Sequence, residues 1–343
     1  MITIDGSQGE GGGQIVRSSL ALSLITGIPI RIENVRAGRK NPGLLRQHLT
    51  AFQAATQISN AQTHGAELGS KVVQFEPGTI TPGRYRFSVG SAGSKTLVFQ
   101  TVLPALMLVD GISHIEVEGG THNPHAPPFD YLARVYFPLL RKLGANVEAG
   151  NCHPGFYPAG GGCFGAKVVG CPSLNRLELL DRGVLLHRRV RALVANLPID
   201  IAERECRLIE RRTNWDAKNF SREEIEGSVG AGNVVMIELE FEHLTELFIA
   251  FGKTGKRAER VANEVLRSAL DYIDQDVPVG TYLADQLLLP MGLAAAQGQS
   301  CVFRTGPLSQ HARTQIDVLM RFLKIKIVVQ ADAGAFLVRL RPP

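Results

Sequence analysis

The segment GEGGGQIVRSSLALSLITGIPIRIENV, residues 9–35, can be laid over GSAGSKTLVFQTVLPALMLVDGISHIEVEGG, residues 90–120. Both contain a glycine-rich turn, an apolar helix, a glycine that stops the helix and a short β-rich strand. The two helix stops, Gly27 and Gly111, lie 84 residues apart. In the helix–strand pairs that follow, Ala61 and Ala145 are equivalent and again lie 84 residues apart. One constant offset over two elements indicates an internal repeat.

A third copy of the pattern is predicted near the C-terminal end. Residues 280–306 supply a turn, a helix, a glycine stop and a strand, and residues 310–330 supply another helix and strand. The glycine stop of this copy, Gly298, lies about a hundred residues further along than the repeat predicts. The excess indicates an insertion at residues 186–279, whose own pattern is a strand, a helix, two strands and a long helix.

The predicted fold is therefore α/β (α+β), with a large domain of three repeated βαβαββ-like units and a small α/β domain inserted before the third unit. The large domain is expected at residues 1–185 and 280–343, and the small domain at residues 186–279. The three repeats are expected at about residues 1–82, at residues 83–170, and at residues 171–185 with 280–343. A coincidental alternation of helices and strands is the alternative explanation.

Composition excludes several classes of protein. The 343 residues are 44% hydrophobic, carry a formal net charge of +5, and contain no uninterrupted apolar run of membrane-spanning length. The five cysteines form no C-x-x-C pair, which argues against a disulfide framework or a zinc site. The N-terminal residues lack the pattern of a signal peptide. We expect a cytoplasmic protein that does not bind membranes, and the mild positive charge allows an anionic partner.

The glycine-rich loop at residues 9–13 looks like a phosphate-binding loop but fits neither the P-loop nor the G-x-G-x-x-G template. Its glycines free backbone N–H groups ahead of a helix, and a helix start favours anions. Four arginines and a lysine nearby suit phosphate geometry; they are Arg17, Arg36, Arg39, Arg46 and Lys40. A tight turn beside a solvated basic loop explains these residues equally well.

Glu10 is out of place in a polyphosphate site, because its carboxylate would repel the ligand. A divalent cation between the carboxylate and the phosphates would remove the conflict. In the second repeat, Lys95 or Gln100 could face a ligand, and Pro127 and Tyr131 could form flat walls for a base. In the third repeat, His311 begins a predicted helix; most histidines are surface or core residues, and a catalytic role is the alternative.

Taken together, these segments resemble the RNA 3′-terminal phosphate cyclase family. The resemblance runs over nearly the whole chain, in family order, and the set is specific although any one segment alone would be weak. The segments are DGSQGEGGGQIVR (5–17), RAGRKNPGLLRQHL (36–49), GSAGSKTLVFQTVLPAL (90–106), GGTHNPHAPPFDY (119–131), GFYPAGGG (155–162), YLADQ (282–286) and the segment around His311.

The resemblance implies an ATP-dependent reaction that converts an RNA 3′-terminal phosphate to a 2′,3′-cyclic phosphodiester through covalent histidine–AMP and an RNA-adenylate. It implies His311 as the nucleophile, Glu10 as the carboxylate associated with Mg²⁺ or Mn²⁺, and phosphate contacts from basic residues and one glutamine. The predicted catalytic residues are His311, Glu10, Arg17, Arg36 and Arg39. The predicted ATP-binding residues are Gln47, Gln100, Pro127, Tyr131, Tyr282, Leu283, Ala284, Asp285 and Gln286.

The sequence departs from the family pattern in two places. Pro154 stands where a basic residue is expected, with His153 before it, and Gln315 follows Thr314 where the family often has asparagine. We expect little effect from the second change. The expected partners are ATP and an RNA with a 3′-phosphate end. Arginines that open the inserted domain, among them Arg188, Arg189 and Arg191, could contact RNA backbone or form a solvated face.

The main alternative is a non-catalytic relative, a ribosome-assembly or RNA-binding protein that keeps the fold and loses the chemistry. Such relatives lack the nucleophilic histidine and part of the arginine set, whereas this chain keeps both. An enolpyruvyl transferase built from the same repeated unit would need six units and a longer chain. The physiological RNA, the preferred metal and the oligomeric state, monomer or dimer, stay open.

Overall fold

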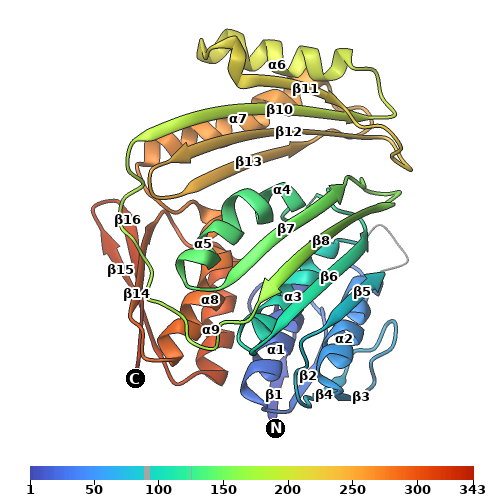
Figure 1. Cartoon of the computed structure of the whole chain (residues 1–343), viewed down its shortest axis with the longest axis vertical. Helices are drawn as coiled ribbons and strands as arrows, with labels where there is room; N and C mark the ends of the chain where they lie inside the picture. The colour runs from blue at the N-terminus through green and yellow to red at the C-terminus, as the bar shows by residue number, and fades with distance from the viewer. Residues whose placement is uncertain (89–92, 125) are drawn as a thin grey trace.

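The computed structural model of this chain describes residues 1–88, 93–124 and 126–343. The glycine turn expected at residues 90–92 lies outside these described residues. Figure 1 shows a large lower body that contains both chain ends and a smaller upper body built from the middle of the chain. The fold is mixed α/β, which confirms the predicted fold class. The exact domain boundaries stay a prediction.

Three sheets in the described part of the chain share one strand order and one set of strand directions. In each, the first strand runs parallel to the second, and the remaining pairs are antiparallel. In sheet order, the strands are β1 (Ile2–Asp5), β2 (Ile30–Glu33), β4 (Val73–Glu76) and β3 (Gln62–His64); β5 (Arg84–Ser88), β6 (Ile112–Gly119), β8 (Gly162–Val169) and β7 (Asn146–His153); and β9 (Glu178–Leu179), β14 (Cys301–Thr305), β16 (Ala335–Arg341) and β15 (Lys326–Asp332). The same connection pattern therefore occurs three times along the chain.

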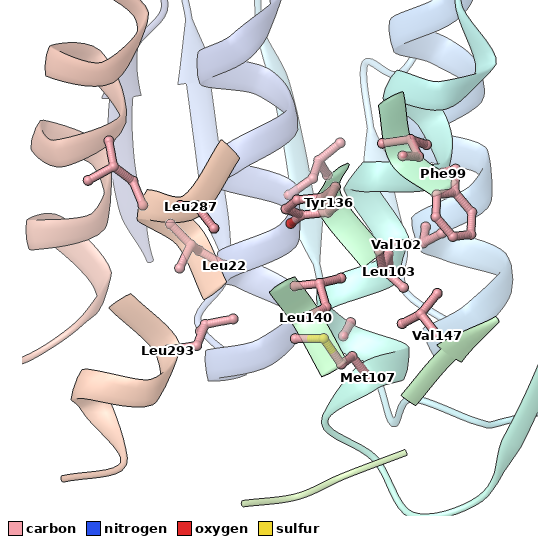
Figure 2. Packing of buried hydrophobic residues seen from close by; sticks show 14 of the residues in the cluster. Leu22, Phe99, Val102, Leu103, Met107, Tyr136, Leu140, Val147, Leu287 and Leu293 are labelled. Carbon is pink, nitrogen blue, oxygen red and sulfur yellow. The ribbon is translucent and has the colours of Figure 1, made fainter. Parts of the chain in front are cut away.

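Helices of these three sheets pack against one another and form the core of the large body. They are α1 (Gly13–Thr26), α2 (Arg46–Ser59), α3 (Lys95–Met107), α4 (Phe129–Tyr131), the π-helical turn η1 (Leu132–Tyr136), α5 (Phe137–Lys142), α8 (Thr281–Ala296) and α9 (Gln310–Phe322). Helices α1, α3 and α8 are buried on nearly all sides, because their apolar residues do not keep to one face. Figure 2 shows Leu22, Leu103, Leu140 and Leu287 converging from four of these segments.

The inserted segment forms a fourth sheet with two amphipathic helices, α6 (Asp200–Thr213) and α7 (Ala258–Gln275), and its own apolar cluster. Its strands, in sheet order, are β11 (Phe220–Glu224), β10 (Leu185–Ala195), β12 (Gly232–Phe241) and β13 (Thr245–Phe251), and a short 3₁₀ turn, η2 (Ala217–Asn219), precedes β11. Strand β11 was not among the expected elements. Among the described residues, no helix is both long and apolar enough to cross a membrane.

The two bodies meet at the loop GFYPAGGG (155–162), where the Phe156 side chain packs against Gly232 of the inserted sheet and the Val229 side chain packs against Gly161 of the loop. A Cβ added to Gly232 would lie 2.0 Å from Cγ of the Phe156 ring, and one added to Gly161 would lie 2.3 Å from Cγ2 of Val229. Glycine is therefore required at both positions for this close approach.

We expect Gly232→Ala to lower the free energy of unfolding by about 1–3 kcal/mol, because the buried Phe156 ring would have to move. Urea unfolding measures the change. Gly165→Ala on β8 is the matched control, since the nearest atom to the added Cβ, the carbonyl oxygen of Ile115, lies 3.8 Å away. Equal unfolding midpoints for the two variants would contradict the proposed close contact.

Candidate active site

The glycine-rich loop of the first unit ends against helix α9 of the third. The backbone N–H of Glu10 donates to Oγ1 of Thr314, at 3.2 Å. Gly9 has a φ of +60°, and a Cβ there would lie 2.1 Å from the same Oγ1, so a side chain at this position is excluded on two counts. The loop is thereby held beside the start of α9, where His311 lies.

His311 is half-exposed and has a defined hydrogen-bond partner. Ser309 caps α9 through the Ala312 N–H, and His311 lies in the first turn. The Nδ1–H of His311 donates to Oε1 of Gln14, at 2.6 Å, and Oε1 of Glu10 lies 3.9 Å from the same nitrogen. When Nδ1 of a neutral imidazole carries the proton, Nε2 keeps its lone pair. A His311 ring that donates through Nδ1 can therefore present Nε2 to a ligand.

Gln14 is itself oriented by a second amide. Its Nε2 donates to Oε1 of buried Gln315, at 3.3 Å, and the hydroxyl of Ser18 donates to the same oxygen. Because the Gln14 amide nitrogen faces Gln315, the Gln14 carbonyl oxygen faces His311. Sequence reasoning did not select Gln14, although its place four residues after Glu10 and three before Arg17 puts it beside both at the start of α1.

Charged residues surround this histidine. The Glu10 side chain is only 7% exposed and forms an ion pair with Arg39. Burial lowers the pKa of Arg17 to about 10, and the Glu10 charge opposes that shift. Arg17 therefore stays cationic at neutral pH. The structure thus brings together four of the predicted catalytic residues, Glu10, Arg17, Arg39 and His311, with Gln14 between them.

Arg36 holds the loop that carries Arg39. Its backbone is left-handed, with a φ of +55°. Its Nη1 donates to the carbonyl oxygens of Asn41 and Gly43, at 2.6 and 2.9 Å, and the residue is buried. Burial lowers its pKa. In this structure Arg36 shapes the basic loop, and its predicted phosphate contact stays a prediction.

His48 is a second site residue that sequence reasoning missed. Burial and the charges of Arg17 and Arg36 lower its pKa to about 3, so the ring is neutral at physiological pH. Its Nδ1 accepts from the Leu45 N–H, at 3.2 Å. A Cβ on Gly13 would lie 2.3 Å from its Nε2. Gln47, predicted to bind ATP, is half-buried beside it on α2.

A pocket lies between the first turns of α1, α8 and α9 and the middle of α3. The Nε2 of Gln100 donates to Oε1 of Gln286 across it. The lining residues are Gln14, Arg17, Ser18, Ala21, Leu97, Gln100, Thr101, Tyr136, Asp285, Gln286, Leu289 and Gln315. Three predicted ATP-binding residues, Gln100, Asp285 and Gln286, therefore line the same pocket as Arg17.

Asp285 connects α8 to the start of α9. Its Oδ1 accepts from the Ser309 hydroxyl, at 2.6 Å. Burial raises the pKa of Asp285 to about 6, against the Ser309 hydrogen bond and the nearby His311. The cap of α9, and with it the position of His311, therefore depends on a carboxyl group in the pocket.

The other predicted nucleotide-binding residues differ in exposure. Tyr282 is 77% exposed and Pro127 is half-buried, so both have ring faces open to a ligand. Tyr131 is buried, and its hydroxyl has no hydrogen-bond partner in the described part of the chain. The side chains of Leu283 and Ala284 are buried in the core. Any contact of those two residues with a ligand would have to come from their backbone.

Glu246 of the inserted sheet reaches the start of α8. Its buried carboxyl accepts from the Gly280 N–H, at 2.7 Å, two residues before Tyr282. Burial raises the pKa of Glu246 to about 8, and the Gly280 hydrogen bond opposes the shift. Tyr131 lies within electrostatic range of both Glu246 and Asp285.

Within the described residues, no group of three histidine, cysteine, aspartate or glutamate side chains is placed to hold a metal ion. Glu10 and Asp285 are the carboxyl side chains described at the site, and Asp285 already accepts a hydrogen bond from Ser309. This donor set fits Mg²⁺ or Mn²⁺ only if the cation arrives with a substrate phosphate that supplies further oxygens, which is the usual mode for Mg²⁺ with nucleotides.

Two of the arginines considered for RNA contact are engaged in ion pairs. Arg189 pairs with Glu238, and Arg191 pairs with Glu223 and Asp130. Arg188 lies over the Trp215 ring, 5.8 Å from its centroid. Arg189 and Arg191 thus bind carboxylates of the protein itself in this structure.

Comparison with known proteins identifies the family of this chain. The family model for RNA 3′-terminal phosphate cyclase matches residues 8–329. A curated RNA 3′-terminal phosphate cyclase from Salmonella enteritidis PT4 is 47% identical over 99% of this chain and 98% of its own length. One from Koribacter versatilis is 46% identical over 99% of this chain and 95% of its own. The chain belongs to the RNA 3′-terminal phosphate cyclase family and is an enzyme.

A solved enolpyruvyl transferase, NikO from Streptomyces tendae, is 9% identical and aligns with a TM-score of 0.38, covering 98% of this chain and 48% of that chain. A likeness at that level supports no statement about fold or function.

Glu246 predicts a pH dependence of stability. Because its folded pKa is raised, the folded protein keeps a proton that the unfolded chain loses above its ordinary value of 4.5. The stabilisation is complete below about pH 4.5 and is lost as the pH rises to about 8. Relative to wild type, Glu246→Gln should therefore become more stable between pH 5 and 8, by at most about 1.4 kcal/mol per pH unit. Thermal unfolding of both proteins at several pH values measures this difference. A difference in stability that stays constant over this pH range would refute the raised pKa of Glu246.

Proposed function

We propose that this enzyme uses ATP to convert an RNA 3′-terminal phosphate to a 2′,3′-cyclic phosphodiester, with His311 as a covalent nucleophile. The observation that carries the proposal is the hydrogen bond from Nδ1 of His311 to Gln14, because a ring that donates through Nδ1 can present Nε2 to a substrate. Membership of the cyclase family, and relatives that carry the name of this enzyme, support the substrate class.

In the first step, Nε2 of His311 attacks the α-phosphorus of ATP. A phosphorus–nitrogen bond forms, the bond to the pyrophosphate oxygen breaks, and pyrophosphate leaves. Arg17 and Arg39 would stabilise negative charge that develops on the transferred and departing phosphates. Glu10 would hold Mg²⁺ or Mn²⁺, which supplies further charge neutralisation when bound.

In the second step, AMP passes from His311 to the RNA 3′-phosphate, and the imidazole is released. In the third, the neighbouring ribose 2′-OH attacks that phosphorus, loses its proton, and expels AMP. A phosphate monoester is a poor electrophile because its oxygens are charged, so adenylylation supplies the leaving group. The 2′-OH is already adjacent, which makes the closing step intramolecular.

The nucleotide would lie in the pocket described above. Gln47, Gln100, Asp285 and Gln286 would provide polar contacts, and adenine would lie between Pro127 and Tyr282 with Tyr131 nearby. The exposed ring of Tyr282 and the open side of Pro127 support this placement. Arg36 would contribute to phosphate binding through the basic loop that it holds in shape.

A non-catalytic scaffold is the competing function. The hydrogen-bond network from buried Ser18 through Gln315 and Gln14 to half-exposed His311 favours the enzyme. A binding module has no need of a histidine held in one tautomer by two amides.

Incubation with ATP labelled at its α-phosphate and Mg²⁺, without RNA, should leave label on the denatured protein. The linkage should resist base and be lost in acid, as a histidine phosphoramidate does. His311→Ala should abolish the label, and His64→Ala, which changes an exposed histidine on β3, should retain it. Label that persists in His311→Ala would place the nucleophile elsewhere, and a folded wild type without label would favour the scaffold.

Glu10→Gln should slow labelling on the order of 10–100-fold, because the site loses the carboxylate that balances Arg39 and the cation. Part of the loss should be recovered by raising the Mg²⁺ or Mn²⁺ concentration. Glu33→Gln is the matched control, since Glu33 also pairs with an arginine but lies on β2. Unchanged labelling by Glu10→Gln across metal concentrations would remove Glu10 from the mechanism.

A further inference from the structure

We propose that the inserted domain positions the nucleotide slot of the large domain, and that Arg191 is the positioning residue that connects them. The proposal rests on the proposed function, because it concerns the slot between Pro127 and Tyr282. It assigns a role in nucleotide affinity to a domain that contributes none of the residues predicted for the chemistry.

Arg191 joins the two bodies through a continuous chain of charged groups. Its Nη1 donates to Oδ1 of Asp130, at 2.6 Å, in the segment that carries Pro127. Its Nε and Nη2 donate to both oxygens of Glu223 on β11, each at 2.8 Å. The other oxygen of Asp130, Oδ2, lies 3.0 Å from Nε2 of the buried His122. Arg191 on β10 thus fixes the carboxylate that in turn holds His122.

The chain is shielded from solvent, which strengthens each contact. The side chains of His122, Asp130 and Arg191 are at most 20% exposed. Burial alone would raise the pKa of Asp130, but the hydrogen bonds and charges of His122 and Arg191 hold it well below its usual range. Removal of the arginine would leave a carboxylate buried without its cation, which is costly.

The start of the same segment is tied to the inserted domain by a second route. The N–H groups of Thr121 and His122 both donate to the carbonyl oxygen of Gly155, at 2.9 and 3.0 Å. The next residue, Phe156, packs against Gly232 of β12. Both ends of segment 121–131 are therefore anchored at the joint, and Pro127 lies between the anchors.

The opposite wall of the slot also contacts the inserted domain. Glu246 on β13 accepts the hydrogen bond from Gly280 at the start of α8, and Tyr282 lies in the first turn of that helix. The inserted sheet thus contacts the segments on both sides of the proposed adenine position. A shift of Pro127 relative to Tyr282 would weaken base binding, while His311 and Arg17 would remain in place on other elements.

The test compares Arg191→Met, Arg191→Lys and Arg204→Met in the ATP-labelling assay. Arg191→Met should raise the ATP concentration that gives half-maximal labelling rate about 10–50-fold and change the maximal labelling rate less than about threefold, the pattern of lost uniform binding. Arg191→Lys keeps a positive charge beside Asp130 but cannot form the bidentate pair with Glu223. This variant should therefore recover part of the affinity for ATP. Arg204→Met, which removes a similar ion pair with Glu259 inside the inserted domain, should behave as wild type.

Inhibition by pyrophosphate provides the further readout. Pyrophosphate has no base, so its inhibition constant should be the same in wild type and Arg191→Met. The proposal is overturned if the maximal labelling rate falls while the half-saturating ATP concentration is unchanged, if pyrophosphate binding weakens as much as ATP binding, or if Arg204→Met matches Arg191→Met. If wild type takes no label, the proposed function fails. The present proposal can then still be tested by equilibrium binding of ATP to the same variants, where the Kd of Arg191→Met should again exceed that of wild type by about 10–50-fold.

Discussion

The structure depends on the burial of three helices that are apolar on almost every side. Helices α1, α3 and α8 lose their contact with water by packing against other helices, α1 against α3 and α9 and α8 against α9, and against the sheets of their own units, which places the sheets on the outside of the large body. The first turns of α1 and α8 then lie close to each other and to the start of α9. Backbone N–H groups at helix starts favour anions, so the packing that removes apolar surface also assembles a place for phosphates.

The sequence predicted what is decided locally. The helix stops predicted at Gly27 and Gly298 directly follow the ends of α1 and α8 and have positive φ, because the left-handed turn that ends a helix favours glycine. The stop predicted at Gly111 is misplaced, since α3 already ends at Met107 and the next residue, Leu108, keeps a right-handed backbone. Strand β11 escaped notice since FSREE is short and polar, and it becomes a strand only by pairing with β10. The π-helical turn η1 has no sequence signal that distinguishes it from an ordinary helix.

The site was predictable only in part. The grouping of Glu10, Arg39 and His311 followed from the resemblance, and the structure places them together. Gln14 and His48 were missed because amides and imidazoles acquire a role only from their partners, and those partners lie on other helices. The sequence likewise cannot tell a paired arginine such as Arg191 from a free one, since its carboxylates come from segments 61 and 32 residues away.

Glu10 and His311 are separated by 301 residues along the chain, yet the loop that carries one is bonded to the helix that carries the other. During synthesis, the glycine-rich loop and most of the nucleotide pocket leave the ribosome long before α9 exists. The nascent protein can therefore fold its first two units without possessing a reactive centre. Under the proposed mechanism, activity would begin only when residues 309–315 emerge and dock, so an incomplete chain would be unable to consume ATP.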